Sequence, residues 1–193
     1  MKRKNTISAT LLFFILTGSM ALNAQTGKSL VTPFKKGNVT FNAGVGFGTD
    51  YKNEYASSSA FGTKAAFEFG IWQAGPGVVS LGVEFGGTTS NQTNRYYNDD
   101  FRSHTFVVAA RSAWHYGWKV RRLDTYAGIS TGAGFHHYDY YNNAHDRYDH
   151  NDVIPVVGGF VGASYFFTPK FGVNAEAGFD ITSLQGGIIF RLK

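Results

Sequence analysis

Residues 39–47 read VTFNAGVGF, and apolar side chains occupy every second position of this stretch. In an extended chain successive side chains point to opposite faces, so the stretch divides into an apolar face and a face of polar or small residues. The apolar face carries Val39, Phe41, Ala43, Val45 and Phe47, and the other carries Thr40, Asn42, Gly44 and Gly46. This period of two predicts a β-strand with one face in an apolar environment.

Strands of the same kind are predicted at residues 39–48, 61–71, 78–87, 104–115, 124–135, 154–166, 172–179 and 184–192. Each is close to the length of about ten residues that a tilted strand needs to cross a membrane. The chain has no apolar run long enough for a membrane helix. These features predict an all-β fold, an eight-stranded antiparallel up-and-down transmembrane β-barrel.

The connections between the predicted strands alternate between long and short. Three are long and polar, at residues 49–60, 88–103 and 136–153; three are short, at residues 72–77, 116–123 and 167–171, and the last hairpin, at 180–183, is also short. Outer-membrane barrels have long loops outside the cell and tight turns in the periplasm. We therefore expect the N-terminus of the barrel in the periplasm and the long connections at the surface of a Gram-negative bacterium.

The first residues have the pattern of a secretory signal. Lys2, Arg3 and Lys4 precede an apolar stretch at residues 7–16 that is too short to span a bilayer, and small residues follow at 19–24. Cleavage is expected after Ala24, with cleavage after Ala21 as the alternative. The predicted organisation is a signal peptide over residues 1–24, a periplasmic N-terminal lead over 25–38 and an outer-membrane β-barrel over 39–193.

Charge and cysteine content exclude several classes of function. The chain has 18 basic and 13 acidic residues, so removal of the three basic residues of the signal leaves 15 against 13, a formal net charge of +2. No stripe of Lys and Arg remains that would indicate a nucleic-acid partner. The absence of cysteine excludes disulfides, thiol catalysis and thiolate-bound metals, and no motif indicates a cofactor.

The polar face of the predicted strands consists mainly of Gly, Ser, Ala and Asn. Small residues suit a narrow lumen, which favours a membrane barrel over a soluble lipocalin-like barrel with an apolar interior. A register that pairs Gly70 with Val78 would set Lys64 against Glu84 as a cross-strand ion pair. Six charged residues are expected in the interior, with Asp124 near a rim: Lys64, Glu68, Glu84, Arg111, Glu176 and Arg191.

Aromatic residues gather at the short turns. All three tryptophans lie at or beside these turns. Aromatic rings are enriched where the apolar core of a membrane meets the lipid headgroups. We therefore expect an aromatic girdle in contact with outer-membrane lipid, formed by Trp72, Trp114, Tyr116, Trp118, Tyr165, Phe167 and Phe171.

Residues 162–179 read GASYFFTPKFGVNAEAGF, a glycine-rich strand that ends in aromatics, a tight turn and a strand with an inward Glu176. This run resembles the penultimate hairpin of the outer-membrane β-barrel family that includes OmpA-like and OmpX-like proteins. Leu123, Asp124, Tyr126 and Gly128 resemble the opening of the family's fifth strand. The resemblance implies a porin-like architecture and insertion by the barrel assembly machinery, and it implies no activity. Members of the family often end in an aromatic residue, whereas the last residue here is Lys193.

The third long connection, HHYDYYNNAHDRYDHND at residues 136–152, is the chemically distinctive segment. Its histidines and aspartates are ligand types for a divalent metal such as zinc or copper, which makes His136, His137, His145 and His150 candidate metal ligands. No fixed ligand spacing supports such a site. The favoured interpretation is a tyrosine-rich surface that contacts an extracellular macromolecule, as the loop at residues 88–103 also would.

An enzyme is the main alternative of another class. Lipid A deacylases of this size resemble the chain in architecture and use a His two residues before a Ser, yet none of the six histidines here has Ser at that position. We therefore expect no catalytic residues. The predicted function is that of a non-enzymatic outer-membrane barrel with an envelope-structural, partner-binding or adhesion role; the alternatives are a lipid-modifying enzyme and a surface metal-binding protein.

Overall fold

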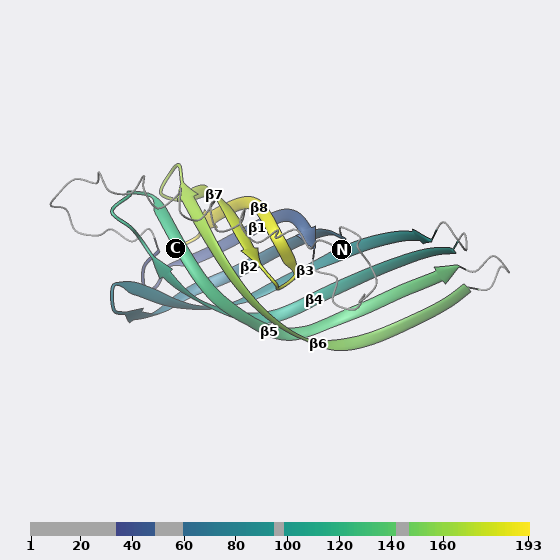
Figure 1. Cartoon of the computed structure of the whole chain (residues 1–193). Coiled ribbons are helices and arrows are strands. Elements are labelled where there is room, and N and C mark those ends of the chain that lie inside the picture. The colour runs from purple at the N-terminus through teal and green to yellow at the C-terminus, as the bar shows by residue number, and fades with distance from the viewer. Residues whose placement is uncertain (1–33, 49–59, 95–98, 142–146) are drawn as a thin grey trace, which may run out of the picture. The chain divides into compact units, whose positions relative to one another are not determined.

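The structure, a computed structural model, describes residues 34–48, 60–94, 99–141 and 147–193. Eight antiparallel strands form one closed sheet in which each strand pairs with its neighbours in sequence and the last pairs with the first (Figure 1). The strands are β1 (Val39–Gly48), β2 (Ala60–Ala74), β3 (Gly77–Asn94), β4 (Asp99–Tyr116), β5 (Leu123–Tyr141), β6 (Arg147–Phe166), β7 (Phe171–Gly178) and β8 (Thr182–Arg191). The predicted eight-stranded antiparallel barrel is confirmed. Within the described residues, no helix has the length and hydropathy to cross a membrane.

The outer surface of the barrel is apolar and the interior is polar. Large hydrophobic side chains are exposed on every strand, among them Phe47, Phe69, Leu81, Phe106, Ile129, Val161, Val173 and Ile188. The buried residues include polar and charged side chains from both walls, such as Asn42, Arg111 and Glu176. Two small apolar groups complete the filling; Val107, Ala109, Val156 and Ile181 form one, and Ala113, Tyr126 and Phe160 form the other. This is the reverse of a soluble barrel, and it agrees with the small residues of the polar face, which predict a narrow polar lumen.

The register between β2 and β3 differs from the one predicted. Ala74 pairs with Gly77 across a two-residue turn formed by Gly75 and Pro76. The φ of Gly75, +59°, lies in the left-handed region that glycine tolerates. An irregularity between Gly70 and Trp72 then shifts the ladder. Lys64 therefore pairs with Gly86, and Glu84 pairs with Ala66. The predicted Lys64–Glu84 cross-strand pair is wrong, because a shift of two residues keeps each side chain on its face but changes its neighbour.

Two connections expected as long loops are largely paired strand. The predicted loop at residues 88–103 is shortened because β3 continues to Asn94 and β4 begins at Asp99. The predicted loop at 136–153 is shortened likewise, since β5 continues to Tyr141 and β6 begins at Arg147. Strand pairing is made by backbone N–H and C=O groups, so polar segments beyond the apolar layer of the membrane can continue to pair. Such segments lack the alternation of apolar residues by which a strand is predicted from the sequence. The segment 49–59 of the first long connection lies outside the described residues.

As a result, β3 to β6 reach well beyond β7 and β8 (Figure 1). Strand β6 pairs with β7 only from Phe160 to Phe166, whereas its pairing with β5 continues to Arg147 opposite Tyr141. In the described sheet, residues 147–159 of β6 therefore form an edge. Pro155 lies in this edge, a position where a strand accommodates a residue without an N–H group. The barrel thus carries a four-stranded extension at the end opposite the short turns.

Candidate functional site

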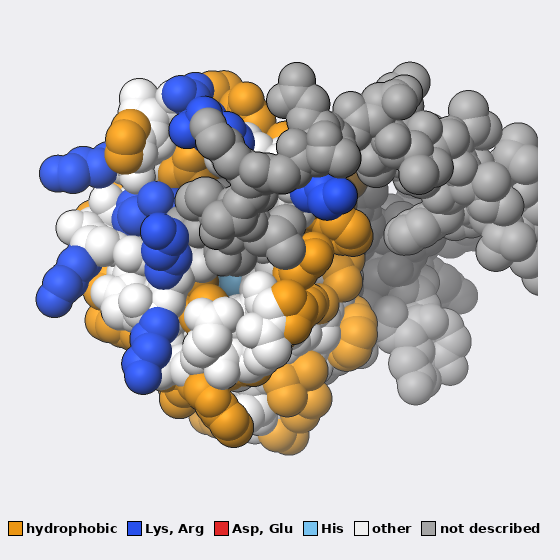
Figure 2. Space-filling view, turned by 90° about the vertical axis from the view of Figure 1, so that its left-hand side faces the viewer, with side chains coloured by type: hydrophobic (Ala, Val, Ile, Leu, Met, Phe, Trp, Pro, Cys, Tyr) orange, Lys and Arg blue, Asp and Glu red, His pale blue; other side chains and the backbone are white. Residues whose placement is uncertain are grey.

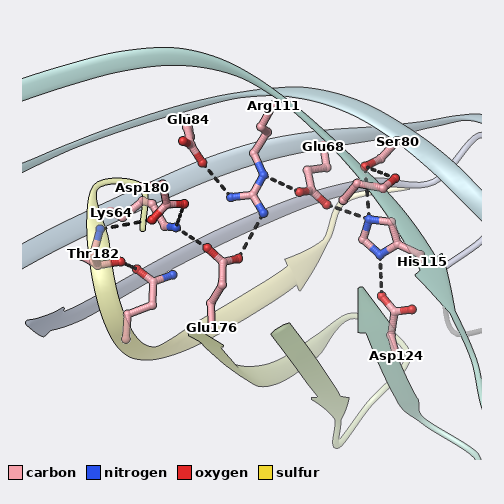
Figure 3. Close-up of polar contacts among 12 residues, drawn as sticks. Lys64, Glu68, Ser80, Glu84, Arg111, His115, Asp124, Glu176, Asp180 and Thr182 are labelled. Carbon is pink, nitrogen blue, oxygen red and sulfur yellow. Dashed lines mark hydrogen bonds and ion pairs between the residues drawn. The ribbon is translucent and has the colours of Figure 1, made fainter. Parts of the chain in front are cut away.

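The interior of the barrel holds a connected set of charged side chains, which we call the interior cluster (Figure 3). Its members are Lys64 and Glu68 on β2, Glu84 on β3, Arg111 and His115 on β4, Asp124 on β5, Glu176 on β7 and Asp180 in the turn before β8. All eight are buried. Side chains from strands on opposite walls meet here because a barrel of eight strands leaves an interior just wide enough for side chains to fill.

Arg111 is the centre of the cluster. Its guanidinium lies 2.6 Å from the carboxylate of Glu68 and 3.0 Å from those of Glu84 and Glu176, measured between the closest nitrogen and oxygen atoms. The ring of Phe160 lies against it, with the guanidinium carbon 3.9 Å from the ring centre. The planar guanidinium can hold several carboxylates at once because its five N–H donors have a fixed geometry. Removal of any one carboxylate would leave a less compensated buried charge.

Lys64 links two parts of the barrel that are not adjacent in the sheet. Its ammonium nitrogen pairs with Glu176 and lies 2.6 Å from Oδ2 of Asp180. The other carboxylate oxygen of Asp180, Oδ1, accepts a hydrogen bond from the backbone N–H of Thr182, which holds the carboxylate in place. Lys64 thereby connects β2 to β7 and to the β7–β8 turn.

His115 closes the other end of the cluster. Its Nδ1 lies 2.9 Å from Oδ2 of Asp124, and its Nε2 lies 3.0 Å from Oε2 of Glu68. The ring of Phe34, from the turn that precedes β1, stacks on the imidazole with ring centres 4.0 Å apart and planes at 18°. Phe34 is 1% exposed. The segment before β1 therefore covers the histidine at the short-turn end of the lumen.

Ser80, His115 and Asp124 have the connectivity of a catalytic relay, since Oγ of Ser80 lies 3.1 Å from Nε2 of the histidine. The surroundings are those of a structural contact. Both ring nitrogens of His115 face carboxylate oxygens, which only accept hydrogen bonds, so both nitrogens donate and neither is available as a base. The Ser80 hydroxyl donates to the backbone oxygen of Ala113, and Ser80 is 0% exposed. This arrangement gives the alternative of an enzyme no support.

The structure places the six predicted interior charges in two groups. Lys64, Glu68, Glu84, Arg111 and Glu176 belong to the interior cluster. Arg191 is apart from it, half-buried at the short-turn end, with its guanidinium carbon 4.4 Å from the centre of the Phe166 ring. The prediction omitted His115 and Asp180, although both lie at even spacing from recognised inward residues, Arg111 and Glu176. For His115, which lies on the same strand as Arg111, the period of two carried the signal that would have found it. Asp180 lies in the turn between β7 and β8, where the strand period does not apply.

The aromatic residues assigned to a girdle form contacts along the short-turn end. Trp114 stacks on Tyr116, which meets Trp118 edge to face. Tyr165 contacts Phe167, and Phe167 contacts Phe171. Trp72 is exposed on β2. The indole N–H groups of Trp114 and Trp118 donate to the backbone oxygen of Ala74 and to the hydroxyl of Thr125, respectively, and such satisfied polar edges allow large rings to remain at an apolar surface.

The candidate metal ligands occupy different environments. Nδ1 of His136 lies 2.8 Å from the hydroxyl of Thr105, and that of His137 lies 2.8 Å from Oδ1 of Asn151. Nε2 of His150 lies 3.2 Å from Oδ1 of Asp152. His145 lies outside the described residues. The described part of the chain contains no group of three or more His, Cys, Asp or Glu side chains that could hold a metal ion.

Comparisons with known proteins give similarity in structure only. No family model matches the chain. No curated protein matches it either. It is similar to the crystal structure of Ail, the attachment invasion locus protein of Yersinia pestis, with a TM-score of 0.52 and 11% sequence identity over 81% of this chain and 95% of that chain.

Two further solved structures are similar. Ail of Yersinia pestis in complex with the heparin analogue sucrose octasulfate gives a TM-score of 0.46 and 14% identity, over 81% of this chain and 96% of that chain. Neisserial surface protein A, NspA, gives 0.41 and 12% identity, over 80% and 90%. From the first comparison together with the closed sheet, this chain has the fold of the small eight-stranded barrels that include Ail.

Proposed function

We propose that this protein is a non-enzymatic outer-membrane β-barrel of a Gram-negative bacterium that binds an extracellular macromolecule through the extension of β3 to β6. In this proposal residues 1–24 are a signal peptide, the barrel assembly machinery inserts the strands, and the short turns face the periplasm. The apolar exterior supports the membrane location, because a soluble protein rarely exposes so continuous an apolar surface. The aromatic contacts at the short-turn end support the interface with lipid headgroups.

The filled interior argues against a role in passage of solutes. Arg111, its carboxylate partners and the ring of Phe160 fill the interior of the barrel. Water-filled barrels have about sixteen strands, twice the number here. The interior cluster is best understood as the structural filling of the barrel, which leaves the surface as the place where a partner is recognised.

The observation that carries the proposal is the paired extension of β3 to β6. Strand pairing within it continues to Asn94 opposite Asp99 and to Tyr141 opposite Arg147. Along the β5–β6 hairpin the register sets Tyr140 opposite Tyr148 and Tyr138 opposite His150. Tyrosine provides a large contact area at low entropic cost, so a paired hairpin rich in tyrosine suits recognition of a macromolecule.

Location is tested by expressing the full chain in a Gram-negative host and separating its membranes. The protein should fractionate with the outer membrane and show the heat-dependent change in electrophoretic mobility of a folded small barrel. Protease added to intact cells should cut within the outer hairpins and spare the short turns. Recovery as a soluble periplasmic monomer would refute the location, and cleavage at the short turns would refute the orientation.

Partner binding is tested with a deletion strain that carries the wild-type gene or a variant in which a Gly/Ser linker replaces residues 138–149. Adherence to immobilised extracellular-matrix extract and to cells that lack the protein should be lost in the variant while the heat-dependent mobility change is retained. Equal adherence of both strains would refute binding through this hairpin.

A fluorophosphonate probe should leave Ser80 unlabelled; labelling that the change His115→Gln abolishes would identify an enzyme instead.

A further inference from the structure

Exposed cationic side chains gather at the short-turn end of the barrel. Figure 2 views this end, where blue Lys and Arg side chains gather and no red of Asp or Glu appears on the visible face. The exposed residues come from the segment before β1, the β4–β5 turn, the β6–β7 turn and the residues after β8: Lys35, Lys36, Lys119, Arg121, Arg122, Lys170 and Lys193. We call these seven residues the cationic rim.

Backbone hydrogen bonds bring the segments of the rim together. The N–H of Val39 donates to the oxygen of Lys193 over 2.9 Å, which joins the start of β1 to the end of the chain. The N–H of Arg191 donates to the oxygen of Lys170 over 2.8 Å, and that of Phe166 donates to the oxygen of Arg122 over 2.9 Å. Closure of the barrel therefore brings the segments that carry the rim residues together at one end.

The rim has no exposed anionic partner among the residues whose side chains are described. Five of the acidic residues in that part of the chain are buried in the interior cluster: Glu68, Glu84, Asp124, Glu176 and Asp180. The sixth, Asp152, lies toward the opposite end in the extension. Asp124 is near the short turns, but its carboxylate is held by His115. Among the described side chains, no acidic residue compensates the seven positive charges, and like charges held together favour an external anion.

The depth of the rim indicates what that anion is. Lys119 follows Trp118, which is half exposed, and Lys170 precedes Phe171, another exposed ring. Aromatic rings of this kind lie at the level of the lipid headgroups. Cationic side chains one residue away reach the phosphate groups of the same leaflet, because long Lys and Arg side chains extend toward the interface.

We propose that the cationic rim binds the phosphate groups of anionic phospholipids in the leaflet that surrounds the short turns. The proposal rests on the membrane location proposed above. Phospholipid is favoured over a periplasmic polymer because the rim lies directly beside the exposed aromatic residues. A surface that binds a polymer outside the bilayer would instead carry its cations farther from these residues. Each cation near an anionic membrane surface raises the affinity about fivefold at low salt. Salt screens this attraction, so binding should weaken as the salt concentration rises.

The three tryptophans provide a reporter for this rim, because all of them lie at the short-turn end. Protein purified from outer membranes is placed in phosphatidylcholine vesicles, and tryptophan quenching is compared between brominated phosphatidylglycerol and brominated phosphatidylcholine. For wild type, the binding constant for phosphatidylglycerol relative to phosphatidylcholine should be about five or more at low salt. At about 1 M salt this ratio should fall close to unity. The variant with Lys119→Gln, Arg121→Gln and Lys170→Gln removes three of the seven charges and should show a clearly smaller preference at low salt.

Matched controls separate charge from other effects. The variant with Lys119→Arg and Lys170→Arg keeps the charge and should keep the preference, and Arg147→Gln, at the start of β6, should leave it unchanged. Equal quenching of wild type by both lipids, or an unchanged preference in the Gln variant, would overturn the proposal while the membrane location stands. Loss of the preference on addition of soluble peptidoglycan fragments would overturn the choice of phospholipid. Quenching by neither lipid would show that the chain is not in the bilayer, and both proposals would fail.

Discussion

Lys64 on β2 and Glu176 on β7 form a buried ion pair across the barrel interior, although the two strands are not neighbours in the sheet. The residues are 112 positions apart in sequence. Glu176 also pairs with Arg111 on β4 over 3.0 Å. Side chains therefore join three separate strands in addition to the backbone ladder, and the interior charges behave as one unit whose members depend on one another.

Removal of Glu176 should be strongly destabilising. The change Glu176→Gln removes a carboxylate shared by Lys64 and Arg111, and the free energy of unfolding should fall by about 3 kcal/mol or more because buried cations lose compensation. Adding Lys64→Met should recover a large part of the loss. Urea unfolding in phosphatidylcholine vesicles measures both. The control is the same cycle with Glu84, which forms its ion pair with Arg111; coupling between Lys64 and Glu84 as large as that between Lys64 and Glu176 would contradict the geometry.

The seam between β1 and β8 should tolerate a methyl group at one glycine and not at another. A Cβ at Gly46 would overlap the backbone oxygen of Leu184, whereas a Cβ at Gly186 meets nothing within 4 Å. Gly46→Ala should lower the free energy of unfolding by about 2 kcal/mol, since a paired backbone cannot yield without breaking the ladder. Gly186→Ala should change it by less than about 0.5 kcal/mol. Similar values for the two variants would show that the strands approach less closely than described.

Phe34 should protect His115 from solvent. The change Phe34→Ala removes the ring that stacks on the imidazole, and burial of an aromatic of this size predicts a loss of about 3 kcal/mol. Hydroxyl-radical footprinting read by mass spectrometry should show new oxidation at His115 and Tyr126, whose ring centre lies 5.2 Å from that of the histidine. Lys36→Ala, an exposed change in the same turn, is the control and should leave both residues protected.

The extension of β5 and β6 should be dispensable for the barrel. Residues 160–166 of β6 provide the pairing with β7, so a linker in place of residues 138–149 leaves every strand pair of the closed wall intact. The variant should keep the heat-dependent mobility change and unfold within about 1 kcal/mol of wild type. A second variant that replaces only residues 142–146 should fold as well and, unlike the first, retain adherence. Failure of the first variant to fold would mean that the extension contributes to closure.

The alternation of apolar and polar residues is sufficient to predict the strands and their faces. It predicts eight strands and which residues share a face, because in a strand the face of each residue depends only on its parity along the chain. The Gly, Ser, Ala and Asn residues of the polar face then indicate that this face lines the interior. The boundaries of β1 at Val39–Gly48 follow from the same pattern. The outer parts of β3 to β6 were missed as strand because their residues lie beyond the apolar layer and carry no alternation.

Which interior charges meet was decided by the tertiary structure alone. The turn at Gly75 and Pro76 and the irregularity between Gly70 and Trp72 displaced the expected partner of Lys64 by two positions, a shift that leaves parity unchanged and is invisible in the sequence pattern. Closure of the sheet then brought Glu176 from β7 to Lys64 and Arg111. The face of a residue is a local property of the chain, whereas the partner of a buried charge depends on register, turn geometry and the curvature of the whole barrel.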